Sequence, residues 1–185
     1  MSNPYADNVS DAKSLLNGGE ATLNRRKAMI ATLGVGYAAS VIPELSHAAI
    51  STSGSGLVEG EISVDVNGFA VPVYRSMPKG NGPFPVVLVL SEIFGVHEHI
   101  ADITRRFAKL GYMALAPELF IRQGDAQGYA VMADLMKEVI NKVPDAQVMQ
   151  DLDAVVAWAG ANGGDLNRLG VTGFCWGGRQ TWLYA

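Results

Sequence analysis

Alternating hydrophobic and polar residues predict a hairpin at the start of the patterned part of the chain. Between 61 and 66, isoleucine and valine alternate with polar residues, which is typical of a half-buried strand. Asn67-Gly68 follows as a strong hairpin signal, and 69–74 supplies the return strand. Pro72 lies inside that return strand and predicts that it runs along an edge of the sheet.

After the hairpin, the pattern alternates between strands and helices. Residues 85–90 are apolar on both faces, as a central parallel strand requires. Apolar residues at helical spacing predict a helix over 100–110, which Gly111 ends. The pattern further predicts a strand at 112–116, a loop at 119–128, helices at 130–142 and 148–159, and a strand at 169–172. This order predicts an α/β sheet with crossover helices.

The first 48 residues differ from the rest of the chain. Arg25-Arg26-Lys27 precedes a weakly apolar run at 28–42, and Ser46-His47-Ala48 has the small-x-small pattern that a signal peptidase cleaves. The paired arginines and the modest hydrophobicity favour a twin-arginine signal, with cleavage after Ala48. The alternative is a disordered tail followed by a surface helix.

This division predicts three parts: an N-terminal region with the signal at 1–48, a flexible linker at 49–57, and a folded domain at 58–185. The signal predicts an exported, periplasmic protein that engages the twin-arginine export machinery.

Composition and charge narrow the class of protein. The chain has 185 residues, of which 49% are apolar and 17% charged, and these proportions exclude collagen-like and disordered chains. Its net charge of -4 gives no support for a nucleic-acid partner. No apolar run approaches the roughly 20 residues that span a bilayer, so we expect no stable membrane span. The single cysteine excludes an intramolecular disulfide.

The candidate chemistry lies around that cysteine. The motif GFCWGG at 173–178 follows a predicted strand and opens a helix, which is the pattern of a nucleophile elbow with cysteine in the serine position. A Cβ at Gly173 or Gly177 would crowd the neighbouring strand or helix. The helix N-terminus favours the thiolate of Cys175, and the N–H of Trp176 would form half of an oxyanion hole. The alternative is that Cys175 is a small buried hydrophobic residue.

The loop SEIFGVH at 91–97, after the first buried strand, is the second candidate. Glu92 lies at the carboxyl end of that strand, where ligands collect in open α/β sheets. The alternative is that Glu92 caps the following helix. We interpret His97 and His99 as surface or loop residues, because both precede the candidate nucleophile in the chain, whereas a catalytic histidine would follow it. The alternative is a shared role as a metal pair, for which no third ligand is apparent. No metal or cofactor is predicted.

Four motifs in this order resemble the dienelactone hydrolase family, also called carboxymethylenebutenolidases. They are SEIFG at 91–95, GYMALAPEL at 111–119, RQ at 122–123 and GFCWGG at 173–178. The resemblance extends from about residue 58 to residue 185. It implies an α/β-hydrolase fold and a Cys-His-Asp triad that opens the ester of an enol-lactone, so that the partner is a small lactone or ester substrate.

The resemblance also implies roles for individual residues. Cys175 would be the nucleophile, and Ile93 and Trp176 would donate the N–H groups of the oxyanion hole. Glu92 would contact the resting thiol, leave on substrate binding and take part in forming the thiolate. Arg122 would pair with the substrate carboxylate through its guanidinium group.

In this fold the triad acid and histidine follow the nucleophile in the chain, and residues 176–185 contain no Asp, Glu or His. The sequence therefore predicts an incomplete α/β-hydrolase domain that lacks its C-terminal part and hydrolyses weakly or not at all. Three hypotheses stay open: a fragment of an exported hydrolase, a non-catalytic truncated product or binding module, and half of a split enzyme.

Overall fold

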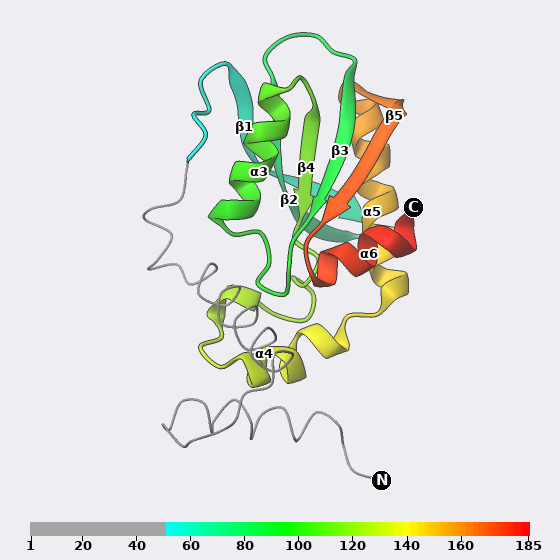
Figure 1. Cartoon of the computed structure of the whole chain (residues 1–185). Helices are drawn as coiled ribbons and strands as arrows, with labels where there is room; N and C mark the ends of the chain where they lie inside the picture. The colour runs from blue at the N-terminus through cyan, green and yellow to red at the C-terminus, as the bar shows by residue number, and fades with distance from the viewer. Residues whose placement is uncertain (1–50) are drawn as a thin grey trace, which may run out of the picture. The chain divides into compact units, whose positions relative to one another are not determined.

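Five strands form a mixed sheet in residues 51–185, the part of the chain that the computed structural model describes (Figure 1). In the order β1-β2-β4-β3-β5 they are Leu57–Val66, Phe69–Pro78, Met113–Pro117, Phe84–Leu90 and Gly164–Gly173. β2 pairs antiparallel with β1 and β4, whereas β3 pairs parallel with β4 and β5. The antiparallel start followed by parallel strands confirms the predicted α/β sheet. The predicted signal and its cleavage site lie outside the described residues.

Helices cover both faces of this sheet. The helical segments are α3 (Glu98–Lys109), η2 (Ala126–Gly128), α4 (Met132–Glu138), η3 (Ile140–Lys142), α5 (Asp145–Ala161) and α6 (Trp176–Tyr184). α3 packs on one face, and α5 and α6 pack on the other (Figure 1). The helix predicted at 130–142 is interrupted, because the backbone of Val139 leaves the helical region with φ -121° and ψ -69°.

β1 and β2 are joined by the predicted two-residue turn. Asn67 and Gly68 have φ values of 54° and 85°. Both lie in the left-handed region that the favoured hairpin turn requires, and asparagine and glycine adopt it at the lowest cost. The antiparallel pairing then continues along the full length of both strands, which extends them beyond the predicted ranges.

The prediction that Pro72 marks an edge strand is wrong, since β2 lies between β1 and β4. The pairing of β2 with β4 begins only at Val73, opposite Pro117. Pro72 therefore lies just beyond the end of that ladder, where its missing N–H breaks no hydrogen bond to β4. Its carbonyl oxygen still accepts a hydrogen bond from the N–H of Glu118, at 2.9 Å.

α3 ends at the glycine that the sequence indicated. Gly111 has a φ of 96°, and its N–H donates to the carbonyl of Ala108. The N–H of Tyr112 donates to the carbonyl of Phe107, and the two rings meet edge to face at 5.8 Å. This is a Schellman motif with its hydrophobic contact, so the chain turns directly from α3 into β4.

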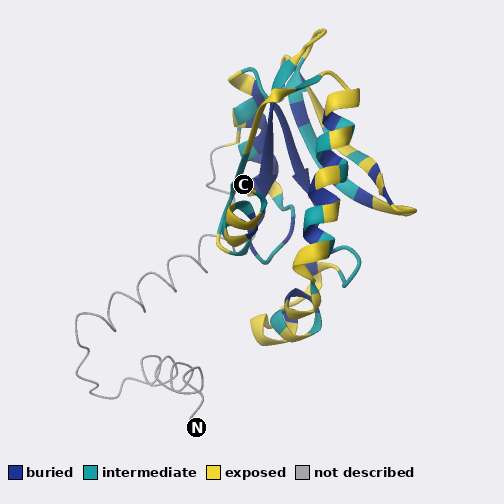
Figure 2. Ribbon diagram, turned by 90° about the vertical axis from the view of Figure 1, so that its right-hand side faces the viewer, coloured by how far each residue is buried: buried dark blue, intermediate teal, exposed yellow. Residues whose placement is uncertain are grey.

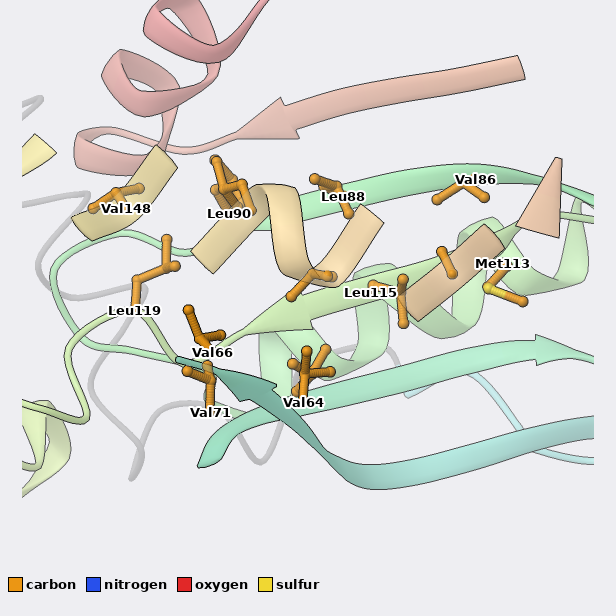
Figure 3. Close-up of a cluster of buried hydrophobic side chains, with 14 residues drawn as sticks. Val64, Val66, Val71, Val86, Leu88, Leu90, Met113, Leu115, Leu119 and Val148 are labelled. Atoms are coloured by element: carbon orange, nitrogen blue, oxygen red, sulfur yellow. The ribbon is translucent and has the colours of Figure 1, made fainter. Parts of the chain in front are cut away.

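The main hydrophobic core lies between the sheet and α5 (Figure 3). Alternate residues of β3 point to opposite faces: Val86, Leu88 and Leu90 join this core, and Val89 packs on the α3 side. Figure 2 shows buried positions along the strands and the inner sides of the helices. The buried members of the core are Val64, Val66, Val71, Val73, Val86, Leu88, Leu90, Met113, Leu115, Leu119, Val148, Leu152, Val155 and Ala159.

A smaller cluster follows β4 and forms its own apolar centre. We call it the Phe120 cluster; its buried members are Phe120, Ala126, Leu135, Val139 and Ile140. Ile93, Phe94 and Trp176 pack against it from the ends of the two strands that carry the candidate site. The segment between β4 and α5 therefore supports that site.

Residues 51–56 run along α3. The N–H of Thr52 donates to Asp102 Oδ1 at 2.5 Å, and Lys109 Nζ donates to the carbonyl of Ser55 at 2.5 Å. Among residues 51–185, none of the helices combines the length and the apolar character that crossing a bilayer requires.

Candidate active site

The turn from β5 into α6 holds Cys175 in a conformation that side-chain-bearing residues rarely adopt. Its φ is 50° and its ψ is -110°, and α6 begins at the next residue, Trp176. The thiol is free and the residue is exposed. The alternative of a small buried hydrophobic residue is therefore wrong.

Both flanking glycines lie against backbone. A Cβ at Gly173 would come within 2.4 Å of the carbonyl oxygen of Gly177 in α6. A Cβ at Gly177 would come within 2.4 Å of the carbonyl oxygen of Ser91 and 2.5 Å of that of Leu90, at the end of β3. The close packing of β3, β5 and α6 thus requires glycine at both positions.

The two neighbours of Cys175 fix the turn on opposite sides. Phe174 packs with the apolar residues beneath α3, and its N–H donates to the carbonyl of Leu90 at 3.1 Å. Trp176 packs against the Phe120 cluster, and the ring centroids of Trp176 and Phe120 are 4.7 Å apart. The elbow is therefore anchored by its neighbours, and no hydrogen bond within residues 51–185 engages the Cys175 side chain.

Glu92 lies in the loop between β3 and α3 and is buried, with 2% of its surface exposed. Its Oε2 is 3.0 Å from Nε2 of His97. His97 itself is the N-cap residue of α3, so the alternative that Glu92 caps this helix is wrong. Within the described residues, no hydrogen bond joins Glu92 to Cys175, the contact that the family resemblance implied.

Both histidines lie where the sequence placed them, with His99 exposed in the first turn of α3 and His97 at the end of the loop before it. The sequence did not indicate the contact between His97 and Glu92. The His97 side chain is 19% exposed and holds the buried carboxylate. The two rings stack with centroids 6.2 Å apart, and the His99 ring lies 6.3 Å from that of Phe174. The start of α3 therefore lies beside the elbow.

The pKa values of two buried carboxyl groups in this region are shifted in opposite directions. Burial raises the pKa of Glu92, but hydrogen bonds from His97 and from its own backbone N–H, with the charges of both histidines, bring it below the ordinary value. Burial also raises the pKa of Glu118, and here burial prevails although the N–H of Val96 donates to Oε2 at 2.8 Å. Glu92 therefore holds its proton less tightly than an ordinary glutamate, and Glu118 holds its proton more tightly.

The N–H groups predicted for the oxyanion hole have no acceptor within the described residues. No backbone or side-chain oxygen of residues 51–185 accepts a hydrogen bond from the N–H of Ile93 or of Trp176. Both side chains pack against the Phe120 cluster, which brings the two residues to the same part of the molecule. Both N–H groups are thus free of an acceptor in the part of the chain that the structure describes, and their joint role as an oxyanion hole stays a prediction.

Arg122 is already paired in this structure. Its Nη1 lies 2.7 Å from Oδ2 of Asp151, a fully buried residue of α5, and its guanidinium lies 4.3 Å above the ring of Phe69. Within residues 51–185 no hydrogen bond or ion pair links it to Glu92 or Cys175. The predicted binding of a substrate carboxylate would have to share or displace the Asp151 contact.

The sequence analysis missed three polar residues: His97, Glu118 and Asp151. For His97 a signal was present in the sequence, because Glu92 and His97 lie at the two ends of one strand-to-helix loop. The partners of the other two are distant in the sequence, so no local pattern identifies them. Within the described residues, no three His, Cys, Asp or Glu side chains group closely enough to bind a metal ion.

Comparison with known proteins adds an independent observation. Residues 71–185 match the model of the "Dienelactone hydrolase family". A protein of Methylorubrum extorquens named "Putative carboxymethylenebutenolidase" is 51% identical over 177 residues, which are 95% of this chain and 60% of that protein. The chain thus spans less than two thirds of this relative.

Solved structures agree with the sequence matches. A crystal structure from Klebsiella pneumoniae described as a "Putative Dienelactone Hydrolase" has 55% identity and a TM-score of 0.68, covering 70% of this chain and 54% of that one. A dienelactone hydrolase-like promiscuous phosphotriesterase from metagenomic libraries has 25% identity and a TM-score of 0.59 over the same shares. These matches confirm the predicted α/β-hydrolase fold class.

Proposed function

Because the chain belongs to the dienelactone hydrolase family, we propose that Cys175 is the nucleophile of a hydrolase that cleaves a lactone or a carboxylic ester. One observation carries the proposal. Cys175 is exposed on a turn with a φ of 50°. It lies between Gly173 and Gly177, and a Cβ at either glycine would clash with neighbouring backbone. A strained conformation that presents a reactive side chain at a helix N-terminus is typical of a catalytic nucleophile.

The proposed chemistry proceeds in two steps. The thiolate attacks the carbonyl carbon, a C–S bond forms, and the carbonyl oxygen becomes an anion that accepts hydrogen bonds from the N–H groups of Ile93 and Trp176. The C–O bond of the ester then breaks, its oxygen takes up a proton from water, and a thioester remains on Cys175. The alcohol of an open-chain ester departs at this point, whereas the enol of an opened lactone stays attached to the acyl group. Water cleaves this thioester, which releases the carboxylic acid and restores the thiol.

Complete turnover needs a base and an acid that the residues after Cys175 do not supply. Residues 176–185 contain no Asp, Glu or His, and His97 is bound to Glu92. We therefore expect a polypeptide of residues 1–185, assayed alone, to be acylated and to hydrolyse esters weakly. In a split enzyme, a second polypeptide would supply both groups.

Acylation by p-nitrophenyl acetate tests the proposal on the chain as it is. Mass spectrometry should find one acetyl group on Cys175, and the Cys175→Ala variant should lose that acetyl group and the accompanying burst of p-nitrophenol. Equal burst and acetylation in the alanine variant would refute the nucleophile. Saturable binding of the ester without any acetylation would favour a non-catalytic binding module.

Arg122 enters the proposal as a residue that recognises a substrate carboxylate. In an acylation assay, Arg122→Ala should raise the substrate concentration that gives half of the maximal acylation rate. The increase should be larger for a carboxylate-bearing lactone than for a neutral ester of similar size. Equal effects on the two substrates would assign Arg122 to structure alone, through its contact with Asp151.

We also propose export through the twin-arginine route, on the basis of Arg25-Arg26 and the apolar run that follows. Replacing both arginines with lysine should retain the protein in the cytoplasm, as fractionation of the producing cells would show. Unchanged export of that variant would contradict the twin-arginine assignment.

A further inference from the structure

The hydrogen bond between Glu92 and His97 is a contact that the proposed chemistry leaves unexplained. The carboxylate side chain is 3% exposed and that of His97 is 19% exposed, so the contact is shielded from water. A buried carboxylate without a partner is costly, and an imidazole five residues along the same loop supplies that partner at 3.0 Å. The contact therefore determines where this carboxylate lies.

The backbone of His97 is held by a hydrogen bond, and its ring has a stacked neighbour. His97 begins α3 in an extended conformation, with φ -89° and ψ 178°, and its N–H donates to the carbonyl of Gly95 at 3.1 Å. Its ring stacks on that of His99. The other ionisable groups whose charges act in this region are Glu118 and Asp125.

The loop that carries Glu92 lies directly against the elbow. The N–H of Phe174 donates to the carbonyl of Leu90, and Gly177 lies against the carbonyls of Leu90 and Ser91. Glu92 and Cys175 are thus each one residue away from atoms in this contact. The side chains of Glu92 and Cys175 therefore start from two backbone segments that are in contact with each other.

We propose that His97 is a positioning residue that holds the Glu92 carboxylate at the start of α3, so that Glu92 reaches the Cys175 thiol only when this hydrogen bond opens. The inference rests on the proposed function, because the position of Glu92 matters for catalysis only if Cys175 is the nucleophile. It assigns the histidine an indirect role: it acts through Glu92 and does not touch the substrate.

The reactivity of the single thiol tests this inference without requiring ester hydrolysis. A carboxylate that lies beside a thiol disfavours the thiolate, because like charges repel. In the full chain, His97→Phe should slow alkylation of Cys175 by iodoacetamide at neutral pH by about threefold, the factor that corresponds to half a pKa unit. His97→Gln, whose amide can still donate to the carboxylate, should restore a rate near that of the wild type.

Two controls separate positioning from a general structural effect. The slowing should vanish when His97→Phe is combined with Glu92→Gln, because no anion then remains to approach the thiol. His99→Phe changes the stacked neighbour but removes no hydrogen bond to Glu92, and its rate should stay near that of the wild type. Circular dichroism and urea unfolding would establish that each variant is folded.

Two outcomes would overturn the inference: a wild-type alkylation rate in His97→Phe, or the same slowing with and without Glu92→Gln. Neither depends on whether the chain turns over an ester. A failure of acetylation at Cys175 combined with the expected alkylation pattern would refute the proposed function and leave the Glu92–His97 contact as an observed control on the thiol.

Discussion

The two loops that meet at the carboxyl ends of β3 and β5 are fixed in opposite ways. The elbow after β5 is fixed by backbone packing, and its Cys175 side chain is exposed. The loop after β3 is fixed by side chains, since Glu92 is bound to His97 and the N–H of Val96 is bound to Glu118. Steric packing holds Cys175 in place while leaving its thiol free, whereas Glu92 is held by a single side-chain hydrogen bond, the one that we propose can open.

The largest effect is expected where the two loops touch. Gly177→Ala would place a methyl group against the carbonyls of Leu90 and Ser91. The backbone at the end of β3 can move away only at a large cost in free energy. We expect a loss of about 3 kcal/mol in the free energy of unfolding. Urea unfolding followed by circular dichroism would measure it.

Gly178→Ala is the matched control, because a Cβ at this position would meet only the carbonyl group of Gly173, at 3.4 Å or more. Alanine favours a helix over glycine by about 1 kcal/mol, so this variant should be neutral or more stable. Equal losses in the two variants would show that the tight contact at Gly177 is not what fixes the elbow.

In the loop after β3, replacing Glu118 tests how much the side-chain contacts contribute to stability. Glu118→Ala removes the acceptor of the Val96 N–H and should cost about 2 kcal/mol. Glu118→Gln keeps an acceptor and removes the charge. If Glu118→Ala unfolds at the same urea concentration as the wild type, then this contact does not hold the loop.

The pH dependence of Glu118 has a definite sign. Its pKa is raised in the folded state by burial, so the native protein retains a proton that the unfolded chain loses. Its contribution to stability should therefore fall as pH rises above the unfolded value of 4.5 toward the folded pKa. Urea unfolding at several pH values should show this fall in the wild type and a smaller one in Glu118→Gln.

The smallest effect concerns the backbone strain at Cys175, the proposed nucleophile. Cys175→Gly should raise the free energy of unfolding by about 1 kcal/mol, because glycine adopts a φ of 50° without steric cost. Cys175→Ala keeps a Cβ and should give no such gain. A stability of the glycine variant below that of the alanine variant would show that the turn is relaxed.

Sequence reasoning predicted well those elements whose determinants are local. The strand at 85–90 and the helix that Gly111 ends depend on periodicity and on one glycine, and both were found. β5 was predicted over four residues but extends over ten. Gly164 and Asp165 also pair with β3, but residues 166–168 interrupt the register before pairing resumes at Leu169, so no alternating pattern marks this part of the strand. Pro72 was misassigned for the same reason, since strand order is not encoded locally.

The candidate site divides along the same line. The elbow could be identified because its glycines, cysteine and helix start are consecutive in the sequence. The Arg122–Asp151 pair joins residues 29 positions apart, and only the fold brings them together. Glu92 was located by its place at a strand end, but its partner His97 was not, because a loop of unknown path decides which side chains meet.

The Phe120 cluster has a consequence for altering this protein. Ile93 and Trp176 both rest on it, although they come from different strand ends. Volume-conserving swaps among Leu135, Val139 and Ile140 would change the apolar surface against which both residues pack. For directed evolution, a small library at these positions is a way to explore new acyl groups, provided that each variant is screened for folding, because the positions are buried.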